Sequence, residues 1–271
     1  MLDFPSLTQR DDAPALVMTS HSSGGASKTT TSLFALDAAW RSSRSLAILE
    51  NDRQDSLAAY GPVTRVIFAP TEEVVHDPIA DIVAHDPLDQ ALRNLGEATT
   101  IFYDGAAASL NRHTYVFEML NVADRLAALG RHCLVLIPVS ARHDLARESL
   151  QGYETWRTLL PAPHQIIPVL FHRDGDLRGV PAGHDLRKLL KMASDGVLVQ
   201  PRVPMPVLIQ HRRSGMKLCD LADSRNPLAT AEIAARIGIA PSIVEMMRRC
   251  AGDALNYMDP QFQRLGFPLG L

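Results

Sequence analysis

The chain has 271 residues, of which 46% are hydrophobic and 21% charged, and its formal net charge is −3. Such a composition excludes a disordered chain, because it supplies enough apolar residues for a core, and the small net charge does not indicate a chain that is basic as a whole. Three cysteines show neither a CxxC pair nor metal-ligand spacing and are expected to be buried thiols in a reducing cytosol: Cys133, Cys219 and Cys250. Because no signal-peptide core and no apolar run of roughly 18 residues is present, we expect a cytoplasmic protein without a transmembrane segment.

Short apolar runs alternate with longer amphipathic stretches, which predicts a mostly parallel, twisted α/β sheet with helices on both faces and a helical C-terminal part. The predicted strands are Ala15–Ser20, Ser45–Glu50, Arg65–Phe68, Thr100–Asp104, Cys133–Val139, Gln165–Phe171 and Gly196–Val199. The predicted helices are Thr29–Arg41, Leu88–Leu95, Thr114–Leu129, Arg142–Thr158, His184–Met192, Ala229–Ile237 and Pro241–Tyr257. Pro161–Pro163 and Pro201–Pro206 are predicted as loops. One domain is expected over residues 1–271, with 1–14 a flexible N-terminal extension and 259–271 a C-terminal tail.

The first predicted strand leads into a loop of small residues and then directly into a helix. The loop ends in Gly24-Gly25-Ala26-Ser27-Lys28-Thr29-Thr30. A strand, such a loop and a helix N-terminus direct several backbone N–H groups at one point, where the helix dipole also favours an anion. Lys28 would add a point charge to the β- and γ-phosphates, and the Thr29 hydroxyl would coordinate magnesium. This context predicts a phosphate-binding loop, although the G-x-x-x-x-G-K-[ST] pattern has Ser22 and Ser27 at its glycine positions.

Acidic residues follow two further predicted strands. The second strand ends in Glu50-Asn51-Asp52, and the fourth ends in Asp104. Carboxyl ends of parallel strands meet at one edge of a sheet, so these carboxylates are expected beside the phosphate loop. An apolar strand that ends in Asp, as at Asp104, is typical of a Walker-B position, where the carboxylate supports the magnesium shell.

With these motifs the chain resembles the ParA/MinD family of deviant-Walker-A P-loop ATPases. Ser23 to Thr30 aligns without a gap with the family loop K-G-G-x-G-K-T-T, and Glu50 to Gln54 matches D-x-D-P-Q. The apolar strand that contains Leu136–Val139 and the segment from Pro204 to Ile237 also resemble family sequences. The likeness extends from about Ala15 to about Arg248 and implies the P-loop NTPase fold.

The resemblance implies a role for each matched residue. ATP and Mg²⁺ would be the cofactors, with the phosphates in the loop of residues 24–30, the metal at Thr29 and Asp104, and Asp52 acting with Lys28 in hydrolysis. Adenine would lie near His172 and Pro204. The resemblance also implies a homodimer bridged by ATP that acts with an adaptor or cargo protein.

Three positions depart from the family pattern. The signature lysine, which in the family reaches the partner's phosphates, is replaced by Ser23. Ser27 stands in place of the glycine before the loop lysine, and Glu50 stands in place of the first aspartate after the second strand. A serine has no charge, so hydrolysis is expected to be slow. Nothing in the sequence selects a substitute cation among Arg41, Arg44 and Arg53.

Three functions remain open from the sequence. The first is an ATPase that positions or partitions a cargo such as a plasmid, a chromosome or a protein complex. The second is a nucleotide-binding regulatory subunit with little turnover, as in exopolysaccharide or cellulose secretion or in conjugation. The third is a P-loop ligase of the dethiobiotin-synthetase kind.

A basic segment late in the chain predicts weak, sequence-independent DNA binding. It carries seven basic residues against one acid, Asp195: Arg187, Lys188, Lys191, Arg202, Arg212, Arg213 and Lys217. Arg212, Arg213 and Lys217 are the candidate DNA contacts, which would make the protein nucleoid-associated. The solvated faces of separate helices are the alternative. Histidines in polar sequence contexts, among them His85 and His211, are expected at the surface.

Overall fold

The computed structural model of the chain describes residues 5–20, 27–42, 45–51, 57–77, 79–106, 109–171, 179–223 and 227–269. The strands are β1 (Leu16–Thr19), β2 (Ser45–Glu50), β3 (Val63–Arg65), β4 (Thr99–Asp104), β5 (Cys133–Val139), β6 (Gln165–Phe171) and β7 (Leu198–Gln200). The helices are α1 (Lys28–Arg41), α2 (Thr71–His76), α3 (Ala80–Ala84), α4 (Asp86–Arg93), α5 (Leu110–Met119), α6 (Val122–Ala128), α7 (His143–Leu159), α8 (Asp185–Met192), α9 (Met205–Ser214), α10 (Leu218–Ala222), α11 (Pro227–Ile237) and α12 (Pro241–Arg264), with a 3-10 turn η1 (Ala58–Tyr60).

The strands form one parallel sheet in the order β3-β2-β4-β1-β5-β6-β7. From β1 the chain first builds one half of the sheet through β2, β3 and β4, and then the other half through β5, β6 and β7. Strand β1 therefore lies where the two directions of winding meet. In open parallel sheets ligands bind beside the carboxyl ends of the strands at such a point.

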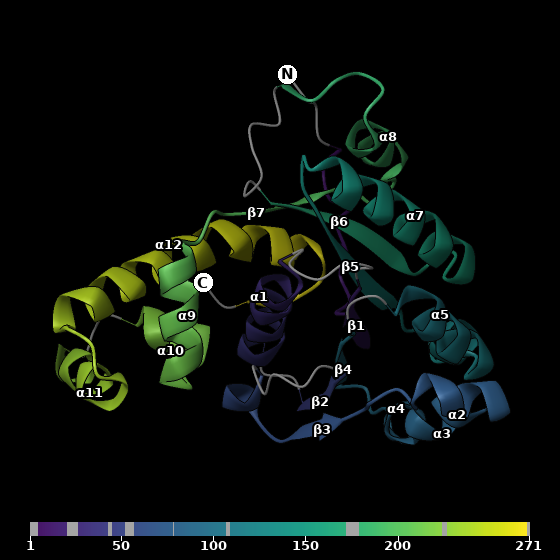
Figure 1. Cartoon of the computed structure of the whole chain (residues 1–271), viewed down its shortest axis with the longest axis horizontal. Coiled ribbons are helices and arrows are strands. Elements are labelled where there is room, and N and C mark those ends of the chain that lie inside the picture. The colour runs from purple at the N-terminus through teal and green to yellow at the C-terminus, as the bar shows by residue number, and fades with distance from the viewer. Residues whose placement is uncertain are drawn as a thin grey trace.

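Helices cover both faces of the sheet, because successive side chains of each strand point to opposite sides. In β1, Val17 belongs to an apolar cluster with α1 and α12, whereas Leu16 and Met18 belong to a second cluster with helices from α4 to α8. Figure 1 shows α1, α9 and α12 on one side of the strands and α5, α7 and α8 on the other. The predicted α/β class with a covered parallel sheet is confirmed.

Several predicted element bounds are wrong. The predicted helix Thr114–Leu129 is two helices, α5 and α6, because Asn121 takes a left-handed conformation (φ 50°), which Asn adopts more readily than most residues. The predicted loop Pro201–Pro206 gives way to α9 at Met205, with a proline in the first turn, where its missing N–H costs nothing. Strand β3 precedes the apolar run predicted for it, and α12 extends to Arg264, into the predicted tail. None of the helices in the described ranges is long and apolar enough to cross a membrane.

Residues 5–14, expected to be flexible, are bonded to distant parts of the chain. The Thr8 amide donates to the Asp195 carbonyl (3.0 Å), and the Arg10 amide donates to the Arg264 carbonyl (2.9 Å). At Gly266 (φ 89°) an added Cβ would lie 2.1 Å from the Asp12 carbonyl oxygen, so only glycine fits there. This segment therefore joins the β7 region to the end of α12.

A buried carboxylate ties α1 to the C-terminal helices. Asp37 is fully buried, and its Oδ1 accepts from the Tyr60 hydroxyl (2.9 Å) and the Cys219 amide (2.9 Å). Its Oδ2 accepts from Arg41 Nε (2.7 Å), and the same guanidinium donates two bonds to Asp259 of α12 (2.7 and 2.6 Å). Burial favours the neutral form of Arg41, but its bonds to Asp259 and Asp37 outweigh this and raise its pKa. The cluster fixes η1, α10 and α12 against α1.

Candidate functional site

The carboxyl edge of the sheet brings together the residues at three strand ends. In the parallel register Thr19 of β1 is the partner of Asp104 of β4, which is also the partner of Glu50 of β2. All three are buried, with Glu50 and Thr19 at 0% exposure. Helix α1 begins just beyond β1, so its first residue, Lys28, reaches the same edge.

Lys28 and Asp104 form a buried ion pair at this edge. The Lys28 Nζ lies 3.0 Å from Asp104 Oδ1, and the two side chains are 8% and 1% exposed. The same oxygen accepts a hydrogen bond from the Ser32 hydroxyl (2.7 Å), and Thr19 Oγ1 lies 3.4 Å away. A lysine and a hydroxyl thus hold the carboxylate in place.

The second oxygen of Asp104 fits a role in binding a metal. Asp104 Oδ2 is buried and accepts no hydrogen bond from the part of the chain that the structure describes. A buried carboxylate oxygen without a partner is costly unless a cation or a water molecule satisfies it. Within the described ranges no three His, Cys, Asp or Glu side chains are grouped to hold a metal. Magnesium does not need such a group, because it is usually held by one or two side chains together with phosphates and water.

The residue before Lys28 has the backbone conformation of a glycine. Ser27, the N-cap of α1, adopts φ 57° and ψ 16°, in the left-handed region. This conformation costs a non-glycine residue roughly 1–2 kcal/mol. The family glycine is therefore missing from the sequence, but the backbone shape that glycine favours is retained at the start of α1.

We expect Ser27→Gly to raise the stability of the nucleotide-free protein by up to about 1 kcal/mol, because the relief of strain exceeds the entropy cost of a glycine. Urea unfolding without nucleotide measures this change. Ser109 is the matched control, because it is also an N-cap but has φ −123°. Ser109→Gly should leave stability unchanged or lower it by a few tenths of a kcal/mol. Equal losses in both variants would contradict the assignment of strain to Ser27.

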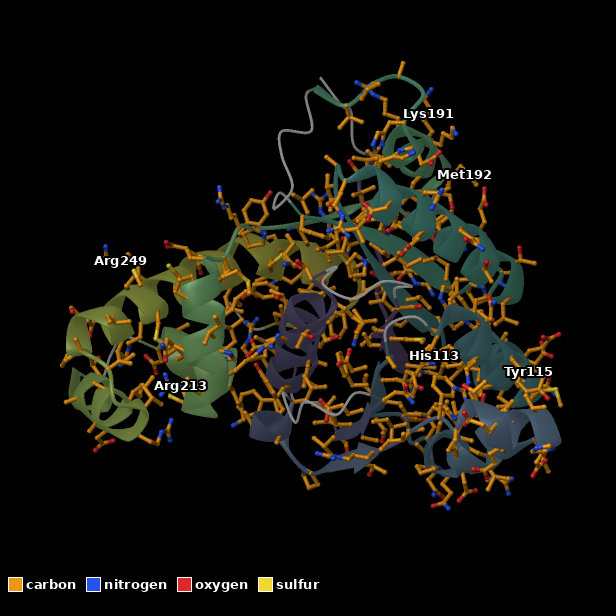
Figure 2. All side chains as sticks on the ribbon, in the orientation of Figure 1. His113, Tyr115, Lys191, Met192, Arg213 and Arg249 are labelled. Atoms are coloured by element: carbon orange, nitrogen blue, oxygen red, sulfur yellow. The ribbon has the colours of Figure 1, made fainter. Side chains whose placement is uncertain are left out.

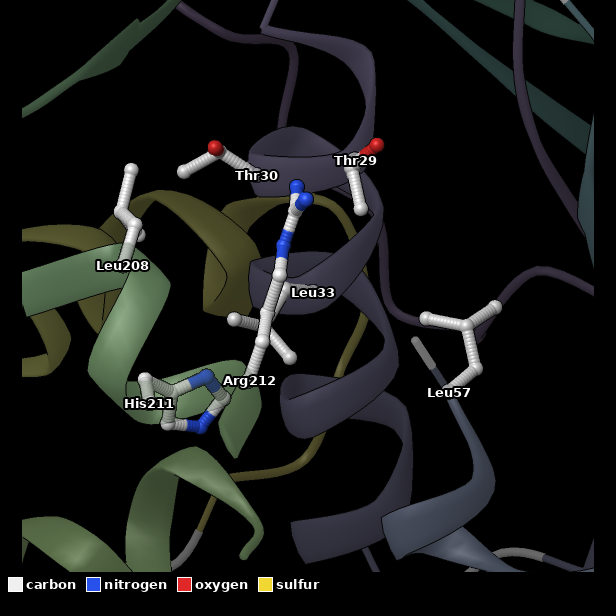
Figure 3. A pocket seen from close by; sticks show the side chains of 7 residues that line it. All are labelled: Thr29, Thr30, Leu33, Leu57, Leu208, His211 and Arg212. Carbon is white, nitrogen blue, oxygen red and sulfur yellow. The ribbon is translucent and has the colours of Figure 1, made fainter. Parts of the chain in front are cut away.

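The next two threonines of α1 border a small pocket. Thr30 is buried and Thr29 is half-buried. The pocket lies between the first turns of α1, the segment at Leu57, and α9, and is lined by Thr29, Thr30, Leu33, Leu57, Leu208, His211 and Arg212. Figure 3 shows the Arg212 side chain extending from α9 along α1, with its guanidinium beside Thr29 and Thr30. Thr31 Oγ1 donates to Gln200 Oε1 (2.8 Å), which ties the start of α1 to β7.

Several predicted site residues lie outside the described residues: Ser23, Gly24, Gly25, Ala26, Asp52 and His172. Of the others, Ser27, Lys28 and Asp104 are brought together at the carboxyl edge. Pro204, predicted to lie near adenine, is the exposed N-cap of α9, the helix that carries Arg212.

A buried polar network behind Asp104 was not predicted. The Tyr103 hydroxyl lies 2.9 Å from His85 Nε2 and 3.1 Å from His113 Nδ1. Burial lowers the pKa of His113 to about 3, to which the neighbouring His85 and Lys28 also contribute, so its ring is neutral at physiological pH. A Cβ at Gly105 would lie 2.9 Å from the Thr19 carbonyl oxygen and 3.1 Å from His113 Nε2. The network packs directly against the strand end that carries Asp104, with His113 at the start of α5 (Figure 2).

The prediction that His85 and His211 lie at the surface is wrong. His85 is 0% exposed and His211 is 4% exposed. Both rings pack against elements distant in sequence, since His85 bonds Tyr103 of β4 and His211 lines the pocket with residues of α1. Polar neighbours along the chain therefore do not indicate exposure here.

The predicted basic segment is divided between the two faces of the sheet. Helix α8 packs into the cluster on one face, and the segment from α9 to α10 packs into the cluster on the other. Figure 2 shows Lys191 and Arg213 far apart in the molecule. The Arg213 guanidinium donates to the Ile237 carbonyl (3.3 Å), and Lys217 lies 4.0 Å from the centre of the Trp40 ring. Arg212 turns instead toward the start of α1, so the three candidate DNA contacts point in different directions.

Comparison with known proteins gives structural likenesses only. No protein-family model matches the chain, and no curated protein matches its sequence. Similar solved structures include MinD in the MinC:MinD cell division complex of Aquifex aeolicus (13% identity, 88% of this chain and 95% of that one, TM-score 0.48). They also include the cell division ATPase MinD of Pyrococcus furiosus (14%, 83% and 98%, TM-score 0.46) and the McdA–ATP complex of Cyanothece (16%, 84% and 98%, TM-score 0.42).

Proposed function

We propose that the chain is a ParA/MinD-like ATPase that binds MgATP at the start of α1, hydrolyses it slowly, and dimerises around the nucleotide to position a cargo with a partner protein. The observation that carries the proposal is the buried pair formed by Lys28 of the phosphate-loop sequence and Asp104 at the carboxyl end of β4 (3.0 Å). A lysine and an acid at this place in a parallel sheet suit a phosphate and its magnesium ion.

In this function each side chain at the edge has a separate task. Lys28 binds the β- and γ-phosphates, which requires its ammonium group to leave Asp104 Oδ1. Thr29 and Asp104 hold Mg²⁺, which, when bound, neutralises charge on the phosphate oxygens. Ser32 continues to orient Asp104 through its hydroxyl (2.7 Å). Asp52, by its place in the sequence motif, orients the attacking water.

Hydrolysis is expected to be slow because Ser23 carries no charge to place against a partner's phosphates. A dimer built without that lysine would act more as a switch set by nucleotide occupancy than as a rapid enzyme. DNA binding is a further part of the proposal, with Arg213, which is exposed on α9, and Lys217, the N-cap of α10, as late basic residues that would contact it.

Two measurements test the proposal. Titration calorimetry gives the affinity for MgATP, MgADP and MgGTP, and light scattering during size-exclusion chromatography gives the mass of the protein. We expect binding of MgATP, a doubling of mass with a non-hydrolysable ATP analogue, and slow phosphate release. DNA binding, measured by anisotropy on two unrelated duplexes, should rise with ATP and fall steeply with salt. The absence of measurable binding of any of these nucleotides would remove the proposed function. Binding without a change in mass would remove only the dimer.

A further inference from the structure

Two short helices, α2 and α3, expose apolar side chains at one end of the molecule (Figure 1). Val75 of α2 is 74% exposed and Val83 of α3 is 65% exposed, more than any other large apolar side chain of the described residues. Ile79, the N-cap of α3, is also exposed and lies one helical turn before Val83. Within the described ranges, α2 has no buried residue. Because a helix of six residues is marginal in water by itself, such a face is suited to being covered by a partner.

Hydrogen bonds hold these two helices in place on the body of the protein. The carboxylate of Asp81, in α3, accepts from the Ala69 amide (3.1 Å) and from Arg112 Nε of α5 (2.7 Å). Between the helices, Asp77 Oδ1 accepts from the Ile79 amide (3.1 Å). The exposed face is therefore organised before any partner arrives, which reduces the entropy lost on binding.

The apolar side chains of α2 and α3 lie in a segment that is strongly acidic. Residues 66–92 contain no lysine or arginine and six acids, Glu72, Glu73, Asp77, Asp81, Asp86 and Asp89. Asp81 is paired with Arg112, and Asp89 with Arg93 and Arg125. The other four acids are exposed and, together with Val75, Ile79 and Val83, form what we call the acidic surface. A partner that fits it must combine apolar side chains with positive charge.

Helix α9 presents this combination in the same chain. Met205 and Ile209 are exposed and lie one helical turn apart. Residues 196–219 contain no acid and four basic residues, of which Arg202 and Arg213 are exposed and flank the apolar pair. Arg213 donates to neutral groups, Gln210 Oε1 (3.2 Å) and the Ile237 carbonyl (3.3 Å), and these bonds do not cancel its charge. Met205, Ile209, Arg202 and Arg213 form what we call the basic surface.

The acidic and basic surfaces of one chain lie on opposite sides of the sheet. Ile82 of α3 packs against the apolar cluster that contains helices from α4 to α8, whereas Val207 of α9 belongs to the cluster with α1 and α12. Figure 1 shows α9 well separated from α2 and α3, with the strands between them. The two surfaces can therefore meet only between two copies of the chain.

We propose that the basic surface of one copy docks on the acidic surface of a second copy, so that copies associate head to tail. Met205 and Ile209 cover the apolar side chains of α2 and α3, and the two arginines lie against the surrounding acids. Because the two surfaces differ, each added copy leaves one surface open, and growth continues until a ring closes or a filament forms. The inference goes beyond the proposed function and does not depend on it, since neither surface includes a residue assigned to the nucleotide.

Sedimentation velocity without nucleotide tests the inference at protein concentrations from about 1 to 100 µM, a range suited to small, weak interfaces. The wild type should associate more as its concentration rises and less as salt rises, because the surfaces have opposite charge. Two double variants each remove one surface: Val75→Ser with Val83→Ser, and Met205→Ser with Ile209→Ser. Each should stay monomeric alone. Their equimolar mixture should form a dimer and nothing larger, since each variant keeps the surface that the other has lost.

Two controls separate a specific interface from a general loss of apolar area or charge. Leu129→Ser with Met192→Ser removes two apolar side chains exposed at the end of α6 and in α8, and should associate as the wild type does. Glu72→Gln with Glu73→Gln keeps the apolar side chains of the acidic surface and should weaken association several-fold. Glu154→Gln, at an exposed position of α7, should leave it unchanged. Circular dichroism confirms that each variant is folded.

The outcomes also separate this inference from the proposed function. A wild type that stays monomeric up to about 100 µM at low salt would overturn the inference, and so would either double variant that still associates alone. A mixture of the two variants that stays monomeric would overturn it as well. Association that appears only with ATP would overturn it while supporting the nucleotide-bridged dimer. If the mixture forms a dimer but the wild type binds no nucleotide, the inference stands and the proposed function fails.

Discussion

Lys28→Ala is expected to weaken MgATP binding at least about 100-fold, because it removes the buried cation assigned to the β- and γ-phosphates. Lys28 is buried, and its ammonium group is placed 3.0 Å from Asp104 Oδ1. Titration calorimetry at matched protein concentrations gives the affinity. Lys191→Ala, on the distant helix α8, serves as the control lysine and should bind as the wild type does.

The ion pair complicates this variant, because Lys28→Ala also leaves Asp104 buried without its cation. A loss of fold would then be mistaken for a loss of binding. The double variant Lys28→Ala with Asp104→Asn removes both charges and should unfold at a higher urea concentration than Lys28→Ala alone. If Lys28→Ala is folded by circular dichroism and still binds MgATP normally, the assignment of Lys28 to phosphate is wrong.

Asp37→Ala is expected to cost about 3–5 kcal/mol of stability, because it breaks a buried charge pair and removes several hydrogen bonds at once. The Tyr60 hydroxyl, the Cys219 amide and one donor of Arg41 would each lose the same acceptor. These groups belong to η1, α10 and α1, so their loosening should expose the interface of α1 with the C-terminal helices. Urea unfolding followed by circular dichroism measures the free energy of unfolding.

Asp253→Ala is the matched control for Asp37→Ala, since Asp253 is an exposed acid of α12. It should change stability by less than about 0.5 kcal/mol, as surface substitutions usually do. If both variants lose a comparable amount of stability, the loss in Asp37→Ala comes from the removal of a negative charge and not from the broken contacts of Asp37.

The parts of the fold that could be predicted from sequence are those set by local patterns. Strands β5 and β6 begin and end where predicted, because their apolar runs are buried on both faces and bounded by polar or turn residues. Lys28 and Asp104 were expected at the carboxyl edge of the sheet. Both the loop motif and the acid at a strand end can be recognised from the residues next to them in the chain. Helix α9 was missed because its first turn contains a proline and follows two others, a composition that is also typical of loops.

Residues whose positions depend on tertiary contacts could not be predicted. His85 and His211 have polar neighbours in sequence but are covered by β4 and α1. Arg212 and Arg213 are adjacent and chemically identical, yet one points to the start of α1 and the other to the end of α11. Consecutive residues of a helix point about 100° apart, so only one of the two can face α1, and which one does so depends on how α9 packs against its neighbours.

The bonds of residues 5–14 also have a consequence for the order in which the protein folds. Thr8 pairs with Asp195, Arg10 with Arg264, and Asp12 packs against Gly266, so residues 5–14 have their partners far along the chain. These contacts close a loop of roughly 250 residues, which is costly in entropy until the intervening sheet has formed. Residues 5–14 can therefore dock only after β7 and the end of α12 have been brought together by the sheet. We expect this docking to be a late step of folding, and hydrogen exchange during refolding should show the amides of Thr8 and Arg10 protected after those of the sheet.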